Sequence, residues 1–194
     1  FRPHRSLAAG VLTMTSSPDI HIYNDVTEER STLAEQVNPG GINFVHHQKP
    51  KRETPKLRNA RQLTELIRKD PRVMGVAPTL SSQVFYNYGP VQLNGTVAGV
   101  DILEEDKLFD LRSKMKSGRL EDLQANADGI IMGTGLARKL NVKTGDRVVI
   151  TTPEGYTMTL KIVGTFQVGI GLVDKIRSYA NSSMVQIILE KDQS

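Results

Sequence analysis

The most regular pattern in the sequence is a long alternation of apolar and polar residues over positions 156–168. Every even position in this stretch is apolar or glycine, whereas most odd positions are threonine, lysine or glutamine. An alternation of this length predicts a β-strand with one buried face. A second, shorter strand over residues 147–151 precedes it, separated by a turn at residues 152–155, so we expect the two strands to form a hairpin.

Immediately upstream, residues 129–140 predict a strand, a glycine turn and one short helix, and residues 141–146 lead from this helix into the hairpin. At the other side of the hairpin, residues 182–189 predict a last helix. This block is the part of the chain with the clearest structural pattern.

The N-terminal third is less regular. Apolar residues at helical spacing predict a short amphipathic helix over residues 5–14, and a short alternation predicts a strand over residues 19–24. The pattern then weakens over residues 25–56, apart from a polar stretch with helical character at 27–36. We interpret residues 25–56 as an exposed insertion.

A helix is predicted to begin at Thr54 and Pro55, because a capping hydroxyl followed by proline is typical of a helix start, and to end at Asp70 and Pro71. The remaining predicted elements are extended segments at residues 73–77, 81–88 and 91–100, and a helix marked by Leu108, Leu111 and Met115 that ends at Ser117 and Gly118. Helices interspersed among mostly neighbouring strands predict an α+β fold rather than a doubly wound parallel sheet.

Composition narrows the class of protein. A length of 194 residues fits one larger domain or two small ones, and 38% hydrophobic with 24% charged residues predicts a globular protein with a packed core. The net charge of +4 is only mildly basic and is no nucleic-acid footprint. No run approaches the roughly 18 apolar residues of a membrane helix, so we expect this sequence itself not to span a membrane, although it can be part of a protein that does.

The chain has no cysteine, which excludes disulfides, thiol catalysis and cysteine metal sites. This absence is compatible with an oxidising periplasm and with the cytosol. Residues 1–15 lack the apolar core and the cleavage pattern of a secretory signal.

The glycine turn is a candidate phosphate site. Gly133, Thr134 and Gly135 precede a helix, and the exposed amides at a helix start can bind an anion. A Walker loop would place a lysine and a hydroxyl residue directly after the last glycine, whereas Leu136 and Ala137 stand there, and the Rossmann spacing is also absent. We therefore expect Thr134 to cap its helix.

The histidines suggest no metal site. His46 and His47 are adjacent, so they cannot share one face of a helix or strand, and no third ligand lies at suitable spacing. His4 and His21 are equally isolated. We predict no catalytic residue, no metal ligand and no cofactor, because no histidine is paired with a nucleophile and an acid at a recognisable spacing.

A basic run could meet anionic lipid or nucleic acid; it comprises Lys49, Lys51, Arg52, Lys56, Arg58 and Arg61. Such a run is more often a solvated surface, Glu53 interrupts it, and the chain has no tryptophan to stack on bases. We predict no nucleic-acid partner.

A glycine loop follows the long strand and contains Gly169, Gly171 and Asp174. It has two interpretations, a flexible contact loop or a turn that glycine permits. We favour the turn.

The block GIIMGTGLARKLNVKTGDRVVITTPEGYTMTLKIVGTF at residues 129–166, the glycine loop with Asp174, and SYANSSMVQII at 178–188 together resemble the extracytoplasmic core domain of MacB-like ABC transporter permeases. This group includes the lipoprotein-releasing and FtsX-type permeases. VMGVAP at residues 73–78 and VAGVDI at 97–102 also match the family's two strands after a helix. The likeness extends from residue 18 onward.

The resemblance implies a periplasmic domain between the first two membrane helices of a permease of the cell inner membrane. It also implies an α+β fold in which a porter-like α/β lobe is interrupted by a small β-rich, Sabre-like lobe. By analogy, residues 1–18 form a juxtamembrane segment, residues 19–101 with 182–194 form the porter-like lobe, incomplete at its C-terminal end, and residues 102–181 form the small lobe.

The function that the resemblance implies is noncatalytic: the domain couples ATP-driven motion to lipoprotein release or substrate export, while ATP is hydrolysed elsewhere. The implied partners are an ABC ATPase subunit and a second permease copy or paralogue, with a lipoprotein substrate or a periplasmic adaptor as further candidates. One permease of the lipoprotein-releasing branch extends this hairpin into an arm that recruits a soluble carrier. Here only the turn at 152–155 joins the strands, so we do not expect carrier recruitment.

The alternative is an independent small β module. LNVKTGDRVVI followed by a second strand also resembles the swapped hairpin of AbrB-like DNA binders and of double-psi barrels, which bind DNA or another ligand. An enzyme is the third hypothesis, and it rests only on the glycine turn.

Overall fold

The computed structural model of the chain describes Ile22 and residues 59–191. The chain divides into two compact units, one of Pro18–Glu65 and the other of Phe1–Ser17 with Leu66–Ser194, so a boundary falls within helix α2 (Ala60–Arg68). Helix α2 confirms part of the helix predicted from Thr54 onward. The predicted helices at 5–14 and 27–36 and the start of the 54–70 helix lie outside the described residues. Of the predicted strand at 19–24 only Ile22 is described, and it is in no strand.

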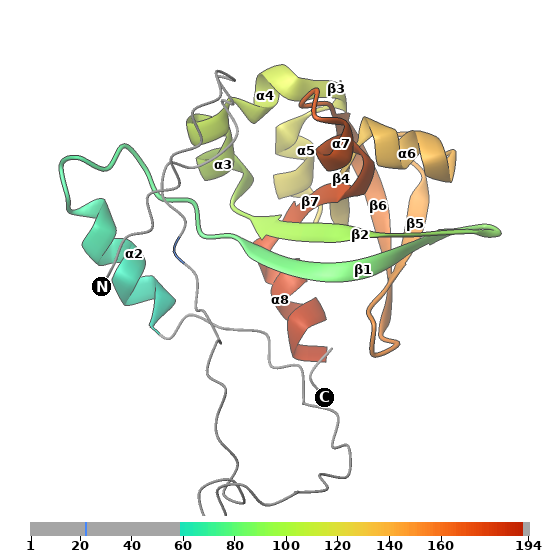
Figure 1. Ribbon diagram of the computed structural model, residues 1–194, viewed down its shortest axis with the longest axis horizontal. Helices are drawn as coiled ribbons and strands as arrows, with labels where there is room; N and C mark the ends of the chain where they lie inside the picture. Colours follow the sequence, from blue (N-terminus) through green and yellow to red (C-terminus); the bar gives the residue numbers. More distant parts are fainter. Residues whose placement is uncertain (1–21, 23–58, 192–194) are drawn as a thin grey trace, which may run out of the picture. The chain divides into compact units, whose positions relative to one another are not determined.

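The unit that includes Leu66–Ser194 holds all of the described strands (Figure 1). The strands are β1 (Leu80–Tyr88), β2 (Val91–Val100), β3 (Met115–Gly118), β4 (Gly129–Gly133), β5 (Arg147–Thr151), β6 (Thr157–Phe166) and β7 (Arg177–Asn181). The helices are α3 (Ile102–Phe109), α4 (Leu111–Lys114), α5 (Leu120–Ala125), α6 (Thr134–Leu140), α7 (Gly171–Ile176) and α8 (Ser182–Lys191).

Six of the strands close into a ring, because β5 pairs with β6 as well as with β1, and the ring continues through β4, β7 and β2. The short strand β3 pairs with β6 along the same edge of β6 that β5 pairs with. Neighbouring strands are antiparallel except for the pairs β2–β7 and β4–β6. This mixed barrel with helices around it confirms the α+β class.

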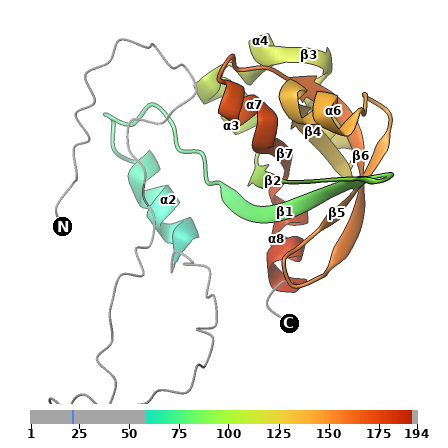
Figure 2. The same ribbon diagram turned by 45° about the vertical axis from the view of Figure 1, so that its right-hand side comes forward.

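Side chains from all six strands of the ring meet in one hydrophobic cluster, which therefore fills the inside of the barrel. This inner core includes Val84 and Tyr86 of β1, Ile130 and Met132 of β4, Val148 and Ile150 of β5, and Leu160 and Ile162 of β6. Helices α6 and α8 contribute to the same core and lie on opposite sides of β1 and β2 (Figure 2). The two helices thus cover the two ends of the barrel.

A second cluster lies on the outer face of the barrel wall. It joins Ile131 of β4 and Tyr179 of β7 to apolar side chains of three helices, namely Ile102 of α3, Leu111 of α4, and Leu120 and Leu123 of α5. Figure 1 shows these three helices together, away from β1 and from the turn between β5 and β6. These three helices therefore cover the outer face of the barrel over one part of its wall, at β4 and β7.

The predicted hairpin of β5 and β6 is confirmed, but the predicted single face of β6 is only partly right. Ile130 pairs with Ile162 and the next residue of β4 pairs with Gly164, so Val163 is a β-bulge. The extra residue reverses the alternation. Leu160 and Ile162 consequently point into the inner core, whereas Phe166 packs in the outer cluster.

The prediction of one continuous helix through Leu108, Leu111 and Met115 is wrong, because the structure has two short helices followed by a strand. Asp110 has φ 48° and ψ 49°, a left-handed conformation that ends α3 and precedes α4. Met115 is already in β3, where it pairs with Phe166. The pairing with β6 therefore overrides the helical spacing of the apolar residues.

The extended segment predicted at residues 73–77 is not a strand. Residues 73–79 have no regular secondary structure and pair with no strand of the described chain. Pro78 follows this segment and has no backbone N–H to donate to a sheet ladder. The predicted extended segments at 81–88 and 91–100 are confirmed as β1 and β2, which pair along their whole length.

The predicted boundary between the two lobes, at residues 101 and 102, falls between β2 and α3. Strands from both sides of it share the ring, since β1 and β2 precede it and β4 to β7 follow it. The division of the chain into lobes stays a prediction. Among the helices of the described residues, none is long and apolar enough to cross a membrane.

Candidate functional site

The glycine turn before α6 has a packing role. Gly133 is the N-cap of the helix, and its conformation is extended. Thr134 is already the first helical residue, and no side chain caps this helix, so the prediction that Thr134 is the cap is wrong. A Cβ atom on Gly133 would collide with the backbone of Asp174, and one on Gly135 would lie 2.9 Å from the Asp174 carbonyl oxygen. Both glycines therefore let α6 approach α7 closely.

The glycine loop and the glycine turn meet at this point, although about forty residues separate them. The Asp174 carboxylate is buried and accepts hydrogen bonds from the backbone N–H groups of Val168 (2.8 Å) and Gly169 (3.1 Å). Gly169 itself has φ +87°, a conformation that favours glycine. This geometry supports a turn at Gly169 that is anchored by Asp174, but the predicted loop is only partly right, because Gly171 and Asp174 themselves lie in helix α7.

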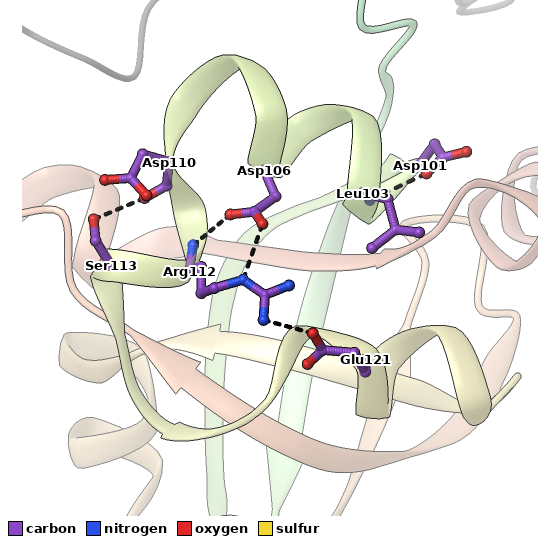
Figure 3. A network of polar contacts seen from close by, with 7 residues as sticks. All are labelled: Asp101, Leu103, Asp106, Asp110, Arg112, Ser113 and Glu121. Atoms are coloured by element: carbon purple, nitrogen blue, oxygen red, sulfur yellow. Dashed lines mark hydrogen bonds and ion pairs between the residues drawn. The ribbon is translucent and has the colours of Figure 1, made fainter.

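A polar network joins the three helices of the outer cluster (Figure 3). The Asp106 carboxylate of α3 accepts hydrogen bonds from the backbone N–H (2.7 Å) and from Nε (3.2 Å) of Arg112 in α4. Arg112 Nη1 lies 2.6 Å from Glu121 Oε1 in α5. The hydrogen bonds to Glu121 and Asp106 raise the pKa of Arg112. The pKa of Glu121 is lowered, first by a hydrogen bond from the Glu121 backbone N–H and then by the hydrogen bond from Arg112. Because the network is exposed, we expect it to orient the helices more than to stabilise them.

Glu105 is an unusual residue in this helical layer. Its side chain is buried, and its Oε2 atom has no hydrogen-bond partner among the described residues. Burial raises the pKa of the Glu105 carboxyl, and the positive charge of Arg177 opposes that shift. The Arg177 guanidinium lies over the Tyr179 ring, 5.6 Å from its centroid.

One polar contact lies inside the barrel. The hydroxyls of Tyr86 in β1 and Ser178 in β7 are 2.5 Å apart, and both side chains are fully buried. Burial raises the pKa of Tyr86, and the hydrogen bond to Ser178 opposes this. The contact links two strands between which β2 lies, so it ties the wall of the barrel across its interior.

Nearly all of the sequence-predicted candidates for acid–base or metal chemistry lie outside the described residues. All four histidines, His4, His21, His46 and His47, lie outside the described residues, as does the basic run except for the exposed Arg61 of α2. Within residues 59–191, no three side chains of histidine, aspartate or glutamate form a group that could hold a metal ion.

Comparison with known proteins connects this architecture to a family. A family model, the MacB-like periplasmic core domain, matches residues 21–187. The chain belongs to this family. The resemblance inferred from the sequence is therefore confirmed, and the chain is a MacB- or LolC-like periplasmic domain of an ABC transporter permease.

Two relatives have the same name. The chain is 30% identical over 135 residues to the lipoprotein-releasing system transmembrane protein LolC of Xylella fastidiosa (strain 9a5c), a match that covers 63% of this chain and 32% of LolC. It is 34% identical over 84 residues to LolC of Neisseria meningitidis serogroup B (strain ATCC BAA-335 / MC58), covering 43% of this chain and 20% of that protein. The matches thus span a third of these relatives or less.

A solved structure shares the fold. The extracellular domain of the noncanonic ABC-type transporter YknZ from Gram-positive bacteria aligns with a TM-score of 0.50 at 15% sequence identity. The alignment covers 66% of this chain and 65% of the YknZ domain. This likeness concerns the fold alone.

Proposed function

We propose that this domain is the noncatalytic, extracytoplasmic part of an ABC transporter permease and that it couples ATP-driven motion to a substrate outside the membrane. The observation that carries the proposal is the family match over residues 21–187. The barrel supports it, since a closed ring with a core inside and a second core outside can move as one rigid body.

The proposal includes partners and a location. In this account the natural full-length protein lies in the cell inner membrane with this domain on the periplasmic side. It assembles with an ABC ATPase subunit and with a second permease copy or paralogue. The names of the LolC relatives and the family description support these assignments.

Within this proposal, lipoprotein release is the more specific function, and export of another substrate is the alternative. The name of both LolC relatives favours lipoproteins. The hairpin argues against docking of a soluble carrier at this place, because its turn is tight. Thr152 N–H donates to the Tyr156 carbonyl (2.8 Å) and Gly155 N–H to the Thr152 carbonyl (3.0 Å), which leaves no extended arm.

The location is tested with the natural full-length protein, tagged at its C-terminus and carrying Thr159→Cys on the exposed side of β6. We expect the protein to stay in the membrane through carbonate and salt washes. We also expect a membrane-impermeant maleimide to label the introduced thiol once the outer membrane is permeabilised. Release by the washes, or labelling only after the inner membrane is broken, would contradict the proposal.

The substrate is tested by depleting the protein in its natural host. If the domain serves lipoprotein release, lipoproteins destined for other locations accumulate in the inner membrane after depletion. Restoration by the full-length protein, and not by one lacking residues 66–191, assigns the effect to this domain. Normal lipoprotein distribution after depletion would favour export of another substrate.

A further inference from the structure

A pocket of about 390 Å³ opens beside α6, at a place that none of the functions above uses. Its lining comes from β3, α6, the loop at residues 141–146, and β6. The lining residues are Ser117, Thr134, Ala137, Arg138, Val142, Lys143, Thr144 and Thr165. Small-ligand pockets commonly measure about 300–1,000 Å³, so this one is large enough for a small molecule. No acidic side chain of the described residues lines it.

Three hydroxyls in the pocket form a chain. Ser117 Oγ lies 2.6 Å from Thr144 Oγ1 and 2.8 Å from Thr165 Oγ1, and Thr165 is nine-tenths buried. Three hydroxyls have three protons, and the two bonds between them use two. Whichever way the chain is directed, one of the hydroxyls keeps a proton for a ligand. The Thr134 hydroxyl, which caps no helix, is a further donor.

Two cationic side chains border these hydroxyls. Arg138 comes from α6 and Lys143 from the following loop, and neither forms an ion pair with any residue that the structure describes. Asp146 lies in the same loop, but its carboxylate accepts a hydrogen bond from the Lys143 backbone N–H (2.9 Å) and does not line the pocket. By contrast, Arg147 lies 3.7 Å from Asp128. The pocket thus gathers positive charge without a neutralising carboxylate from the described chain.

We propose that this pocket binds the phosphate group of a small ester or of a lipid headgroup. Two cations and several hydroxyl donors match the charge and the acceptor oxygens of a phosphate, and charge-assisted bonds of this kind are the strong ones. The pocket volume of about 390 Å³ is many times the roughly 30 Å³ that one water molecule occupies in the liquid. The pocket therefore has room for the phosphate and for part of the group attached to it. The site uses Thr134 of the glycine turn but not its glycines, because Gly133 and Gly135 pack against Asp174. It stands independently of the proposed transport function.

The test uses the 194-residue chain and glycerol 3-phosphate as the soluble probe, titrated by calorimetry or by NMR. The double variant Arg138→Gln/Lys143→Gln removes both cations. Its matched control, Lys139→Gln/Lys191→Gln, makes the same change in net charge at exposed positions that do not line the pocket. We expect saturable binding that weakens about tenfold or more in the first variant and less than about twofold in the second, since hydrogen bonds from charged donors to a phosphate are roughly twice as strong as neutral ones.

A third variant, Thr165→Val, deletes the buried end of the hydroxyl chain; Ser117 and Thr144 then still have one free proton between them, so binding should weaken less than in Arg138→Gln/Lys143→Gln. Flotation with vesicles of phosphatidylcholine, with and without phosphatidylglycerol, distinguishes the source of the phosphate. Binding to glycerol 3-phosphate without flotation indicates a soluble ester, whereas flotation that needs phosphatidylglycerol, Arg138 and Lys143 indicates a headgroup. The proposal is overturned if neither probe binds, or if the two double variants lose binding equally, because binding would then reflect diffuse charge.

Discussion

Two regions of the barrel wall are built in the same way and buried differently. The covered wall, made of β4, β7 and residues 162–166 of β6, has the outer cluster of α3, α4 and α5 on its outside. The open wall, made of β1, β5 and residues 157–161 of β6, has partly exposed outer side chains: Phe85 is 37% and Val149 38% exposed. Both walls share the inner core. The comparison shows that the alternation of apolar and polar residues within a strand determines which side chains face the inner core. Whether the outer face is buried depends instead on helices from other parts of the chain.

The largest expected effect is a contrast between two phenylalanines. Phe166 of the covered wall is fully buried and packs against Tyr179 with ring centroids 5.0 Å apart, whereas Phe85 lies on the open wall. Phe166→Ala should lower the free energy of unfolding by about 3–5 kcal/mol. Phe85→Ala should lower it by less, because Phe85 is 37% exposed and leaves less of a cavity. Urea denaturation of the two variants measures both values, and equal losses would contradict the distinction between the walls.

The next effect concerns the inner core that the walls share. Tyr86→Phe leaves the Ser178 hydroxyl buried without its partner, so the free energy of unfolding should fall by about 1–3 kcal/mol. The control is Tyr88→Phe at the end of the same strand, where the side chain is partly exposed. If the control lost as much as Tyr86→Phe in chemical denaturation, the internal hydrogen bond would not be the cause.

A smaller effect tests how the covering helices are held. The Asp101 carboxylate caps α3 by accepting from the backbone N–H groups of Leu103 (3.1 Å) and Glu104 (3.4 Å), as Figure 3 shows in part. Asp101→Ala should cost about 0.5–2 kcal/mol. Asp128→Ala is the control, because its side chain forms an exposed pair with Arg147. A loss in thermal or urea stability confined to the control would contradict the role of the cap.

The smallest effect depends on pH. Since the folded-state pKa of Glu105 is raised above its unfolded value, the folded protein binds the proton more tightly. The resulting stability is complete below the unfolded pKa and is lost as pH rises through the folded one. Glu105→Gln cannot ionise, so it should be more stable than the natural chain above that window and should not show this fall.

The control for this effect is Glu121→Gln, for which the shift has the opposite sign. The folded-state pKa of Glu121 is lowered, so its contribution is present above the unfolded pKa, and its removal should cost a little stability at neutral pH. Denaturation of both variants between about pH 4 and pH 8 compares them. The same sign of change for both variants at neutral pH would contradict this account of Glu105.

The sequence alone was sufficient where structure is local. The hairpin of β5 and β6, the strand and helix of residues 129–140, and α8 all follow from short-range alternation, turn residues and helical spacing. The bulge at Val163 was not predictable in this way. It is imposed by pairing with β4, about thirty residues upstream.

The elements that were missed depend on distant partners. Strand β3 has only four residues and is defined by its pairing with β6. Strand β7 has the polar Ser178 at an inward position, which is explained by its hydrogen bond to Tyr86, 92 residues away. The pocket has the same origin, because Ser117 and Thr165 are 48 residues apart and meet only when β3 joins β6. The cations Arg138 and Lys143, which follow closely after the glycine turn, are a sequence signal that could have pointed toward it.

The central claim is that this domain belongs to a permease whose motion is driven by ATP. The most direct measurement is ATP hydrolysis by the natural full-length protein, purified through a C-terminal tag from solubilised membranes together with whatever associates with it. The account predicts that an ABC ATPase and its activity elute with the tag, and that the activity disappears when the ATPase's phosphate-binding lysine is replaced. A pure permease preparation with no associated ATPase and no ATP hydrolysis would contradict it.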